Sequence, residues 1–181
     1  MTFYRKRDHE ILPYFGSDED KKFTFCKNVE GLLYHMGLPR YFPNEWRLFI
    51  DSSKSGLKCV LLHNGNEHGS VPIGYSTVLK EKYDAIEFVL RQIKYEQHQW
   101  PICVDLKMVS ILLGQQLGYT KFPCYLCKWD SRADSQHWTG KQWPTRDTLV
   151  PGQHNVIKPL LVTPDNSDAI LILSMFLTSS T

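Results

Sequence analysis

The chain has 181 residues, 42% of them hydrophobic, which suits one well-buried domain and is too short for two. Its 21 Lys and Arg residues against 19 Asp and Glu residues give a net charge of +2, so bulk charge does not indicate a nucleic-acid partner. No charged leader precedes an apolar segment, and the longest apolar run is far shorter than the roughly 20 residues of a membrane span. We therefore expect a soluble, intracellular protein with no membrane partner.

The five cysteines, an odd number, include one Cys-x-x-Cys pair, Cys124 and Cys127. Without a secretory signal, this pattern favours a reducing compartment with metal-bound or free thiols over a disulfide framework. Cys26, Cys59 and Cys103 lie in or beside apolar runs, which predicts that they are small core residues.

Residues 1–25 carry a basic cluster at 5–7 and an acidic cluster at 18–20. Opposed clusters of this kind are typical of a solvated arm or a surface helix. Residues 26–38 then place apolar side chains at helical spacing and provide Gly37 as a stop, which predicts a short amphipathic helix.

The segment 46–65 predicts two strands joined by a tight turn. The apolar run at 48–50 suits a buried central strand, and the Ser-rich stretch 52–56 has turn chemistry, so Asp51 is expected where the first strand ends. An acidic group there is either simply solvated or one of two carboxylates that hold a divalent metal. The second strand is expected at 57–62.

An Asn-Gly pair at 64–65 favours a tight hairpin turn into a third strand within 70–79. Apolar periodicity then predicts one helix over 80–99, a short strand at 102–104, and a second helix from 106 to 114 or 118. The expected order of elements is β-β-β-α-β-α.

Three antiparallel strands, a helical crossover and a fourth strand parallel to the first predict an α/β fold with a ribonuclease-H-like mixed sheet. The right-handed crossover places the fourth strand beside the first, so Asp51 and Asp105 are expected at the same edge of the sheet. Two such carboxylates suit Mg²⁺ or Mn²⁺, the ions of two-metal phosphodiester cleavage. In the alternative interpretation, Asp51 starts a turn and Asp105 caps the next helix. The residues alone leave both open.

Cys124 and Cys127 are spaced to hold one Zn²⁺ from a single turn, and a structural site needs two more ligands. His137 is the first candidate for the third ligand. Weaker candidates for the fourth are His154, Asp130 and Asp134. A metal would help to stabilise this segment, which has little helix or strand periodicity. A redox pair is disfavoured because the motif follows a helix and does not open one, and two plain buried thiols are a further alternative.

The other histidines, His63, His68 and His98, flank a turn or end a helix, and we expect them at ordinary surface positions. The chain thus divides into an N-terminal arm with a short helix at 1–45, a ribonuclease-H-like core at 46–122, a loop-rich zinc-binding segment at 123–162, and an apolar tail at 163–181.

The motifs at 46–54, 60–66, 105–107, 112–133 and 136–138 resemble a family of uncharacterised invertebrate proteins derived from DNA transposons, over about residues 3–162. More remotely, the layout is similar to the catalytic domain of DDE transposases with a zinc-binding insertion, as in the Transib elements and the antigen-receptor recombinase. The resemblance implies that Asp51 and Asp105 bind catalytic metal, that Cys124 and Cys127 bind zinc, and that DNA is the partner, with the nucleus a candidate location.

The sequence departs from that transposase pattern near its end. The family's longer members continue past Val162 with a histidine and acidic helices, whereas here no glutamate follows Glu96, and Asp165 and Asp168 precede an apolar tail. In those transposases an acidic residue on a later helix completes a catalytic triad with the two aspartates, and this third member is missing here. We expect a C-terminally truncated, inactive transposase-like domain. The alternatives are a non-catalytic DNA- or protein-binding module and, third, a metal-dependent nuclease. No small-molecule substrate is indicated, and the oligomeric state is left open.

Overall fold

The computed structural model describes residues 10–20, 22–38, 40–53, 56–140, 142–162 and 170–172. Its strands are β1 (Phe15–Ser17), β2 (Thr24–Cys26), β3 (Trp46–Ser53), β4 (Gly56–His63), β5 (Val71–Ser76), β6 (Ile102–Val104) and β7 (Ile170–Ile172). Its helices are α2 (Val29–His35), α3 (Tyr83–Gln92), α4 (Tyr95–His98), α5 (Leu106–Leu112) and α6 (Asp134–His137), with 3₁₀ turns η1 (Leu12–Tyr14) and η2 (Pro43–Glu45).

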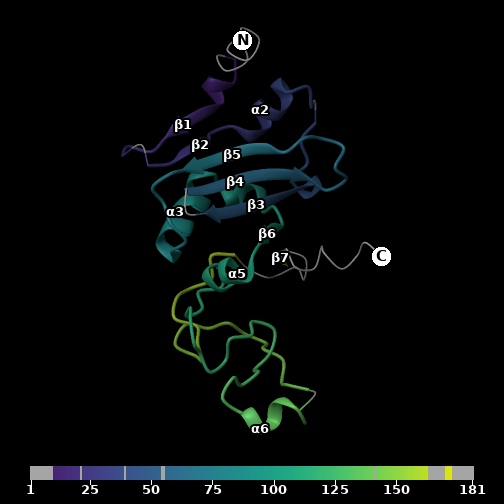
Figure 1. The fold of residues 1–181 in the computed structure, drawn as a ribbon. Helices are drawn as coiled ribbons and strands as arrows, with labels where there is room; N and C mark the ends of the chain where they lie inside the picture. Colours follow the sequence, from purple (N-terminus) through teal and green to yellow (C-terminus); the bar gives the residue numbers. More distant parts are fainter. Residues whose placement is uncertain are drawn as a thin grey trace.

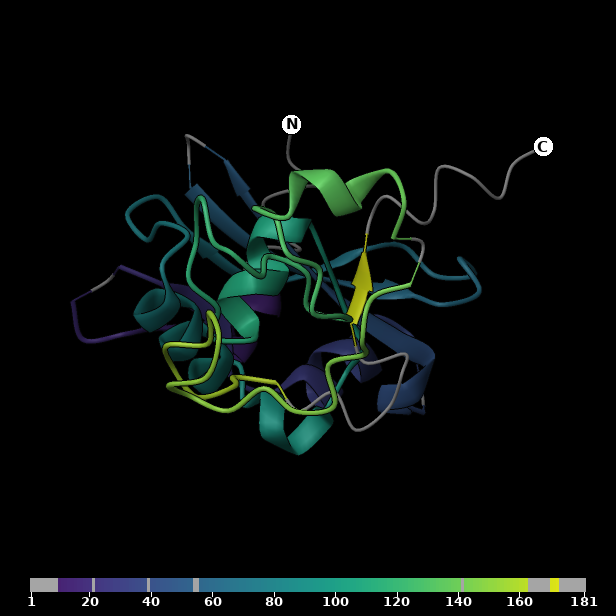
Figure 2. The same cartoon turned by 90° about the horizontal axis from the view of Figure 1, so that it is seen from below.

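The strands form one mixed sheet in the order β1-β2-β5-β4-β3-β6-β7 (Figure 1). In this spatial order, the neighbours within β1-β2-β5-β4-β3 are antiparallel. β6 runs parallel to β3, and β7 runs parallel to β6. The mixed α/β class is therefore confirmed, and β6 lies beside β3 as predicted. After α5 the chain leaves the sheet as a loop-rich segment that carries α6 at its far end (Figures 1 and 2).

The hydrophobic core forms where the sheet meets the helices. Leu48 and Ile50 are buried on one face of β3. Asp51, the next residue, points to the opposite face and is exposed, because side chains alternate between the two faces of a strand. Ile86 and Val89, three residues apart on α3, belong to the same core because that spacing aligns them on one helix face. The amphipathic helix predicted at 80–99 thus packs on the sheet as expected over its first part.

The prediction of a solvated N-terminal arm is wrong for the described residues, because β1 and β2 extend the sheet beyond β5. Phe23 is fully buried, and its ring lies directly over Gly74 of β5, where an added Cβ would come 2.7 Å from the ring. Three-residue strands are too short to show an alternating pattern, which is why the sequence did not reveal them. The basic cluster at 5–7 lies outside the described residues.

The central hairpin also differs from the prediction. β3 continues to Ser53, so Asp51 lies within a strand, opposite Lys58 of β4, and not at the strand end. The Asn-Gly turn does form, with the Asn66 amide donating to the His63 carbonyl at 3.1 Å, but residues up to 70 follow before β5 begins. The connection is thus a seven-residue loop, 64–70, and not a tight hairpin.

The single helix predicted over 80–99 is two helices, because Lys94 adopts a left-handed conformation with φ +55°. The break lets the chain turn so that Trp100 is fully buried. The Trp100 indole N–H donates to the Tyr41 hydroxyl at 2.7 Å, and the Tyr95 hydroxyl donates to the Trp100 carbonyl at 3.0 Å. Burial of one large aromatic residue with its polar atom satisfied therefore overrides the helical periodicity.

The C-terminal apolar segment contributes β7 at its only described residues, 170–172, while the rest of 163–181, including Asp165 and Asp168, lies outside the described part. Cys26, Cys59 and Cys103 are buried, as predicted. Over the described ranges, no helix combines the length and apolarity that crossing a bilayer requires.

Candidate functional site

Asp51 lies near the end of β3, and Asp105 directly follows the parallel neighbour β6. In the β3–β6 ladder Phe49 pairs with Cys103, and each aspartate comes two residues after its strand's member of that pair. The ladder itself ends at this pair, and its register, if continued by two residues, would set Asp51 against Asp105. Both side chains belong to exposed residues, so the fold presents two solvated carboxylates at one edge of the parallel part of the sheet.

Asp105 is also the N-cap of α5, since its Oδ1 accepts a hydrogen bond from the Met108 amide at 2.7 Å. The capping interpretation is thus realised for Asp105, and it uses only one of the two carboxylate oxygens. Asp51 does not start a turn. In the described part of the chain, neither aspartate belongs to a set of three metal-ligating side chains whose ligand atoms all lie within 4.8 Å of one another.

The structure brings the two thiols of the Cys-x-x-Cys motif together. Burial, followed by the interaction with the Cys124 thiol, raises the pKa of the Cys127 thiol. The motif pairs with a later stretch of chain, through an isolated bridge between Cys127 and Thr145 and a 2.9 Å bond from the Arg146 amide to the Leu126 carbonyl. Two converging sulfur atoms held on a paired loop fit the first half of a zinc site.

His137, the expected third zinc ligand, is engaged elsewhere. Its Nε2 lies 2.7 Å from the Asp130 carbonyl oxygen, its Nδ1 lies 3.8 Å from Asp134 Oδ1, and its ring stacks on Trp129. His154 packs edge-on against Phe122. Within the described ranges, no third metal-ligating side chain completes a set with both thiols inside 4.8 Å. The thiols converge, and the remaining ligands stay predictions.

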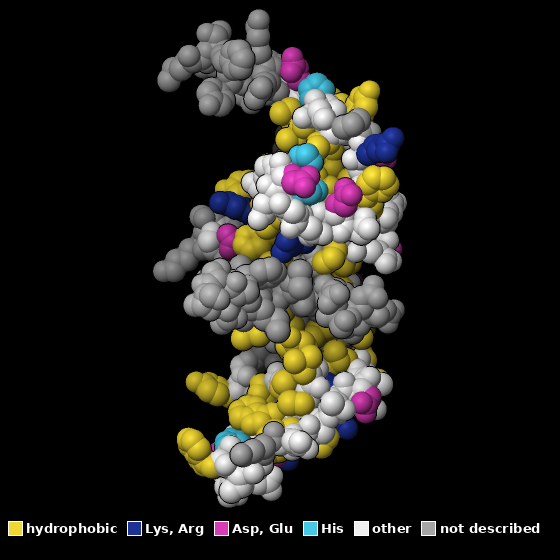
Figure 3. Space-filling view, turned by 90° about the vertical axis from the view of Figure 1, so that its right-hand side faces the viewer, with side chains coloured by type: hydrophobic (Ala, Val, Ile, Leu, Met, Phe, Trp, Pro, Cys, Tyr) yellow, Lys and Arg dark blue, Asp and Glu magenta, His cyan; other side chains and the backbone are white. Residues whose placement is uncertain are grey.

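His63 and His68, which the sequence predicts at ordinary surface positions, come together with Glu67. One ligand atom from each lies within 4.8 Å of the other two. They stand on either side of the Asn-Gly turn, and the spacing His-x-x-x-Glu-His after a strand was the available signal. Figure 3 shows histidine and acidic side chains side by side on the surface over the sheet.

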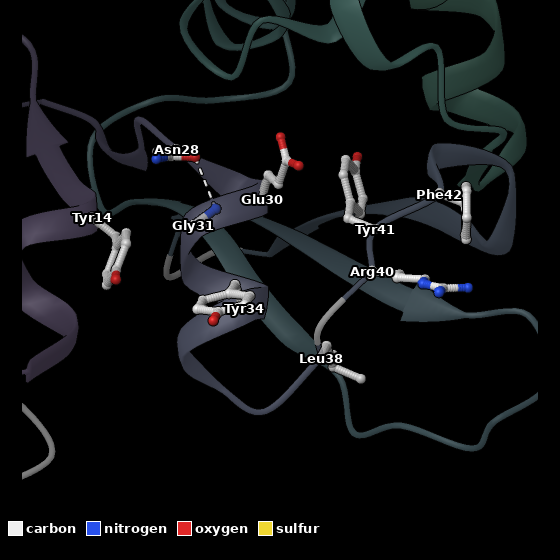
Figure 4. Close-up of a pocket in the computed structure, with 9 residues that line it drawn as sticks. All are labelled: Tyr14, Asn28, Glu30, Gly31, Tyr34, Leu38, Arg40, Tyr41 and Phe42. Atoms are coloured by element: carbon white, nitrogen blue, oxygen red, sulfur yellow. Dashed lines mark hydrogen bonds between the residues drawn. The ribbon is translucent and has the colours of Figure 1, made fainter.

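A pocket of about 600 Å³ lies beside α2 and the segment before η2 (Figure 4). Four of its nine lining residues are aromatic and two carry opposite charges: Tyr14, Tyr34, Tyr41, Phe42, Arg40 and Glu30. The rings of Tyr34 and Phe42 belong to residues that are 69% and 49% exposed, which leaves their faces open to a ligand. None of the predicted metal-binding residues lines this pocket.

A family model described as a domain of unknown function, DUF8703, matches residues 3–162. The chain belongs to this family. Comparison with curated proteins finds no match, and comparison with solved structures finds none. The family description assigns no activity to the DUF8703 domain, so a function has to be argued from the geometry above.

Proposed function

We propose that this DUF8703 domain is a ribonuclease-H-like domain derived from a transposase, which binds a divalent cation at Asp51 and Asp105 and does not cleave DNA. The observation that carries the proposal is the parallel pairing of β3 and β6 with both aspartates two residues beyond the Phe49–Cys103 pair. The strand order β5-β4-β3-β6-β7 supports it, because three antiparallel strands are followed by two parallel ones.

The crossover between β5 and β6 runs through α3 and α4, and a second one runs from β6 through α5 toward β7. Helices at these positions are what a parallel connection needs, since parallel strands cannot be joined by a tight turn. β1 and β2 are additions at the far edge of the sheet and leave the aspartate edge unchanged.

Carboxylate oxygens fit Mg²⁺ or Mn²⁺, which prefer hard ligands and are usually held by one or two carboxylates together with phosphate oxygens. Asp51 and Asp105 would hold the ion, and the ion would offset negative charge on DNA phosphates. Two-metal cleavage requires further fixed ligands to hold both ions, and the described residues supply no third one at this edge. The net charge of +2 gives little electrostatic attraction to DNA, so contact at this edge would be weak.

Zinc at Cys124 and Cys127 belongs to the same proposal, with the paired loop around Arg146 as its scaffold. The two thiols are close enough for Cys124 to raise the pKa of Cys127. If His137 is the third ligand, its Nδ1 would bind zinc while the Nε2–H donates to the Asp130 carbonyl, as the second nitrogen of a ligating histidine commonly does. Zinc would then stabilise a segment that contains little regular structure besides α6.

The test combines cation binding with cleavage. Mn²⁺ binding is followed by electron paramagnetic resonance for the wild type, Asp51→Asn, Asp105→Asn and the control Glu19→Gln, which removes an equally exposed carboxylate elsewhere. Supercoiled and hairpin DNA are incubated with Mg²⁺ or Mn²⁺ and the same proteins. We expect Mn²⁺ binding that both aspartate variants lose and the control keeps, with no cleavage by any protein.

Two results would overturn the proposal in different ways. Unchanged Mn²⁺ affinity in Asp51→Asn and Asp105→Asn would show that the two aspartates do not bind the cation. Cleavage by the wild type that both variants lose would keep the site but show an active nuclease. Retained cleavage in both variants would point to a contaminating enzyme and would leave the binding measurement to decide.

The aromatic pocket favours a second candidate function, a module that binds single-stranded nucleic acid. Exposed aromatic rings next to an arginine are typical of surfaces on which bases stack. Phe42→Ala and Arg40→Ala should each weaken binding of a fluorescent oligonucleotide, and only Arg40→Ala should reduce the dependence on salt concentration. Leu12→Ala, at a residue that is 59% exposed and lies outside the pocket, serves as the control.

A further inference from the structure

We propose that His63, Glu67 and His68 form a second, independent metal site that binds Zn²⁺. In the described part of the chain this is the group of three metal-ligating side chains whose ligand atoms all lie within 4.8 Å of one another. Zinc ligands at roughly 2.0–2.2 Å from a tetrahedral ion stand about 3.3 Å apart, so modest side-chain rotations close the site. Two imidazoles and one carboxylate are a donor set that zinc accepts, with a fourth position left for water.

Both imidazoles are positioned by one buried indole. Trp46 is 2% exposed and pairs with His63 across the β3–β4 ladder. The His63 ring meets the indole edge-on at 5.2 Å between centroids, while the His68 ring stacks on it at 6.2 Å and 16°. The two imidazoles lie 4.7 Å apart. The indole thus reduces the rotamer freedom that the two ligands lose when they bind a metal.

The loop between the ligands is anchored to the start of β3. The Asn64 amide donates to the Glu45 carbonyl at 2.8 Å, and the Asn64 side-chain amide donates to the Asn44 carbonyl at 2.8 Å. Arg47 Nε in turn donates to Asn64 Oδ1 at 2.9 Å. These bonds fix the first residue of the loop, so Glu67 and His68 return toward His63 along a defined path.

Metal binding changes one hydrogen bond in a way that can be observed. The Gly65 amide donates to His63 Nδ1 at 3.3 Å. A neutral imidazole has a single free lone pair. If Nδ1 binds zinc, that lone pair is used, and if Nε2 binds zinc, Nδ1 carries the proton. In both cases the Gly65 amide loses its acceptor, so its NMR signal should move when zinc is added.

The test is a Zn²⁺ titration of the full chain carrying Cys124→Ser and Cys127→Ser, which removes the thiols as competing ligands. Further changes to Glu67→Gln or His68→Gln affect exposed residues and leave the indole contact of His63 in place. The control is His35→Gln, which removes a histidine 3.8 Å from Glu10 that belongs to no such three-residue set among the described residues. We expect one bound zinc per chain, at least tenfold weaker binding in each ligand variant, and no change in the control.

The alternative is that the two imidazoles only cover the indole. In that case Glu67→Gln and His68→Gln would bind zinc as the parent does, or the parent would bind none, and the proposal would be wrong. Near-ultraviolet circular dichroism of each variant checks that the Trp46 environment is intact. A Gly65 amide signal that stays fixed while zinc binds would place the ion elsewhere and would also refute the site.

Discussion

Replacing Asp105 separates its two roles, because alanine removes both while asparagine removes only the charge. The side chain caps α5 by accepting from the Met108 amide at 2.7 Å. Loss of an Asp N-cap costs about 1 kcal/mol, within a range of roughly 0.5–2 kcal/mol. Since Met108 is only 1% exposed, water cannot readily replace the lost acceptor, which places Asp105→Ala near the upper end.

Asparagine caps a helix about as well as aspartate, so Asp105→Asn should lose no more than a few tenths of a kcal/mol. For a domain of this size each kcal/mol lowers the melting temperature by roughly 2–4 °C. Urea denaturation followed by circular dichroism measures the free energy of unfolding, and Mn²⁺ titration of the same samples measures the cation site. The expected pattern is that alanine lowers both and asparagine lowers only Mn²⁺ affinity.

Two results would refute this reasoning. If Asp105→Asn destabilised the protein as much as Asp105→Ala, an uncharged side-chain oxygen could not replace the carboxylate as the acceptor for the Met108 amide. If Asp105→Asn bound Mn²⁺ as tightly as the wild type, the carboxylate would not be a ligand. Asp51→Asn provides the matched comparison, because it removes a carboxylate that caps no helix and should leave stability within about 0.5 kcal/mol.

Three further predictions concern stability and thiol chemistry. Gly114→Ala should destabilise the protein by about 2 kcal/mol or more in urea unfolding, because φ is +62° there and the new Cβ would meet the Lys158 carbonyl oxygen at 2.1 Å. Burial raises the pKa of the Cys59 thiol from 9.0 to about 12, so the stability it contributes is present below pH 9 and falls as the pH rises toward 12. Cys59→Ala should flatten that alkaline decline in unfolding free energy. With a thiol reagent under native conditions, Cys124 and Cys127 should react before Cys59, and zinc should slow the first two; equal rates would contradict the burial difference.

The central part of the fold was predictable because long elements repeat their pattern. The continuous apolar run of Leu48, Phe49 and Ile50 and the helical spacing that includes Ile86 and Val89 indicate buried elements without any knowledge of tertiary contacts. The parallel placement of β6 beside β3 followed from the crossover rule.

The incorrect predictions of secondary structure have a common cause: tertiary contacts determine the structure of these segments. Phe23 secures β2 only because Gly74 leaves room for its ring on the neighbouring strand. The helix break at Lys94 exists because it lets Trp100 be buried. The local sequence indicates neither that a neighbouring strand leaves space for a ring nor that an indole will be buried.

The candidate site shows the same division. The two thiols were predictable because three residues of spacing within one turn determine their convergence. His63 and His68 were not, because their meeting depends on how a seven-residue loop returns and on a shared indole from another strand, Trp46.

The surroundings of the two aspartates indicate how a cation would bind there. Asp105 sits at the N-terminus of α5, where the backbone carries partial positive charge, and Asp51 has Lys58 as its cross-strand partner. A metal ion competes with both positive groups, so two carboxylates alone should hold it weakly. A DNA phosphate would add negative oxygen ligands at the same edge, and Mg²⁺ sites of one or two carboxylates usually depend on such oxygens. Mn²⁺ affinity should therefore rise when an oligonucleotide is present, and the rise should vanish in Asp51→Asn. If DNA left the Mn²⁺ affinity unchanged, the aspartate edge would not be where DNA and metal meet.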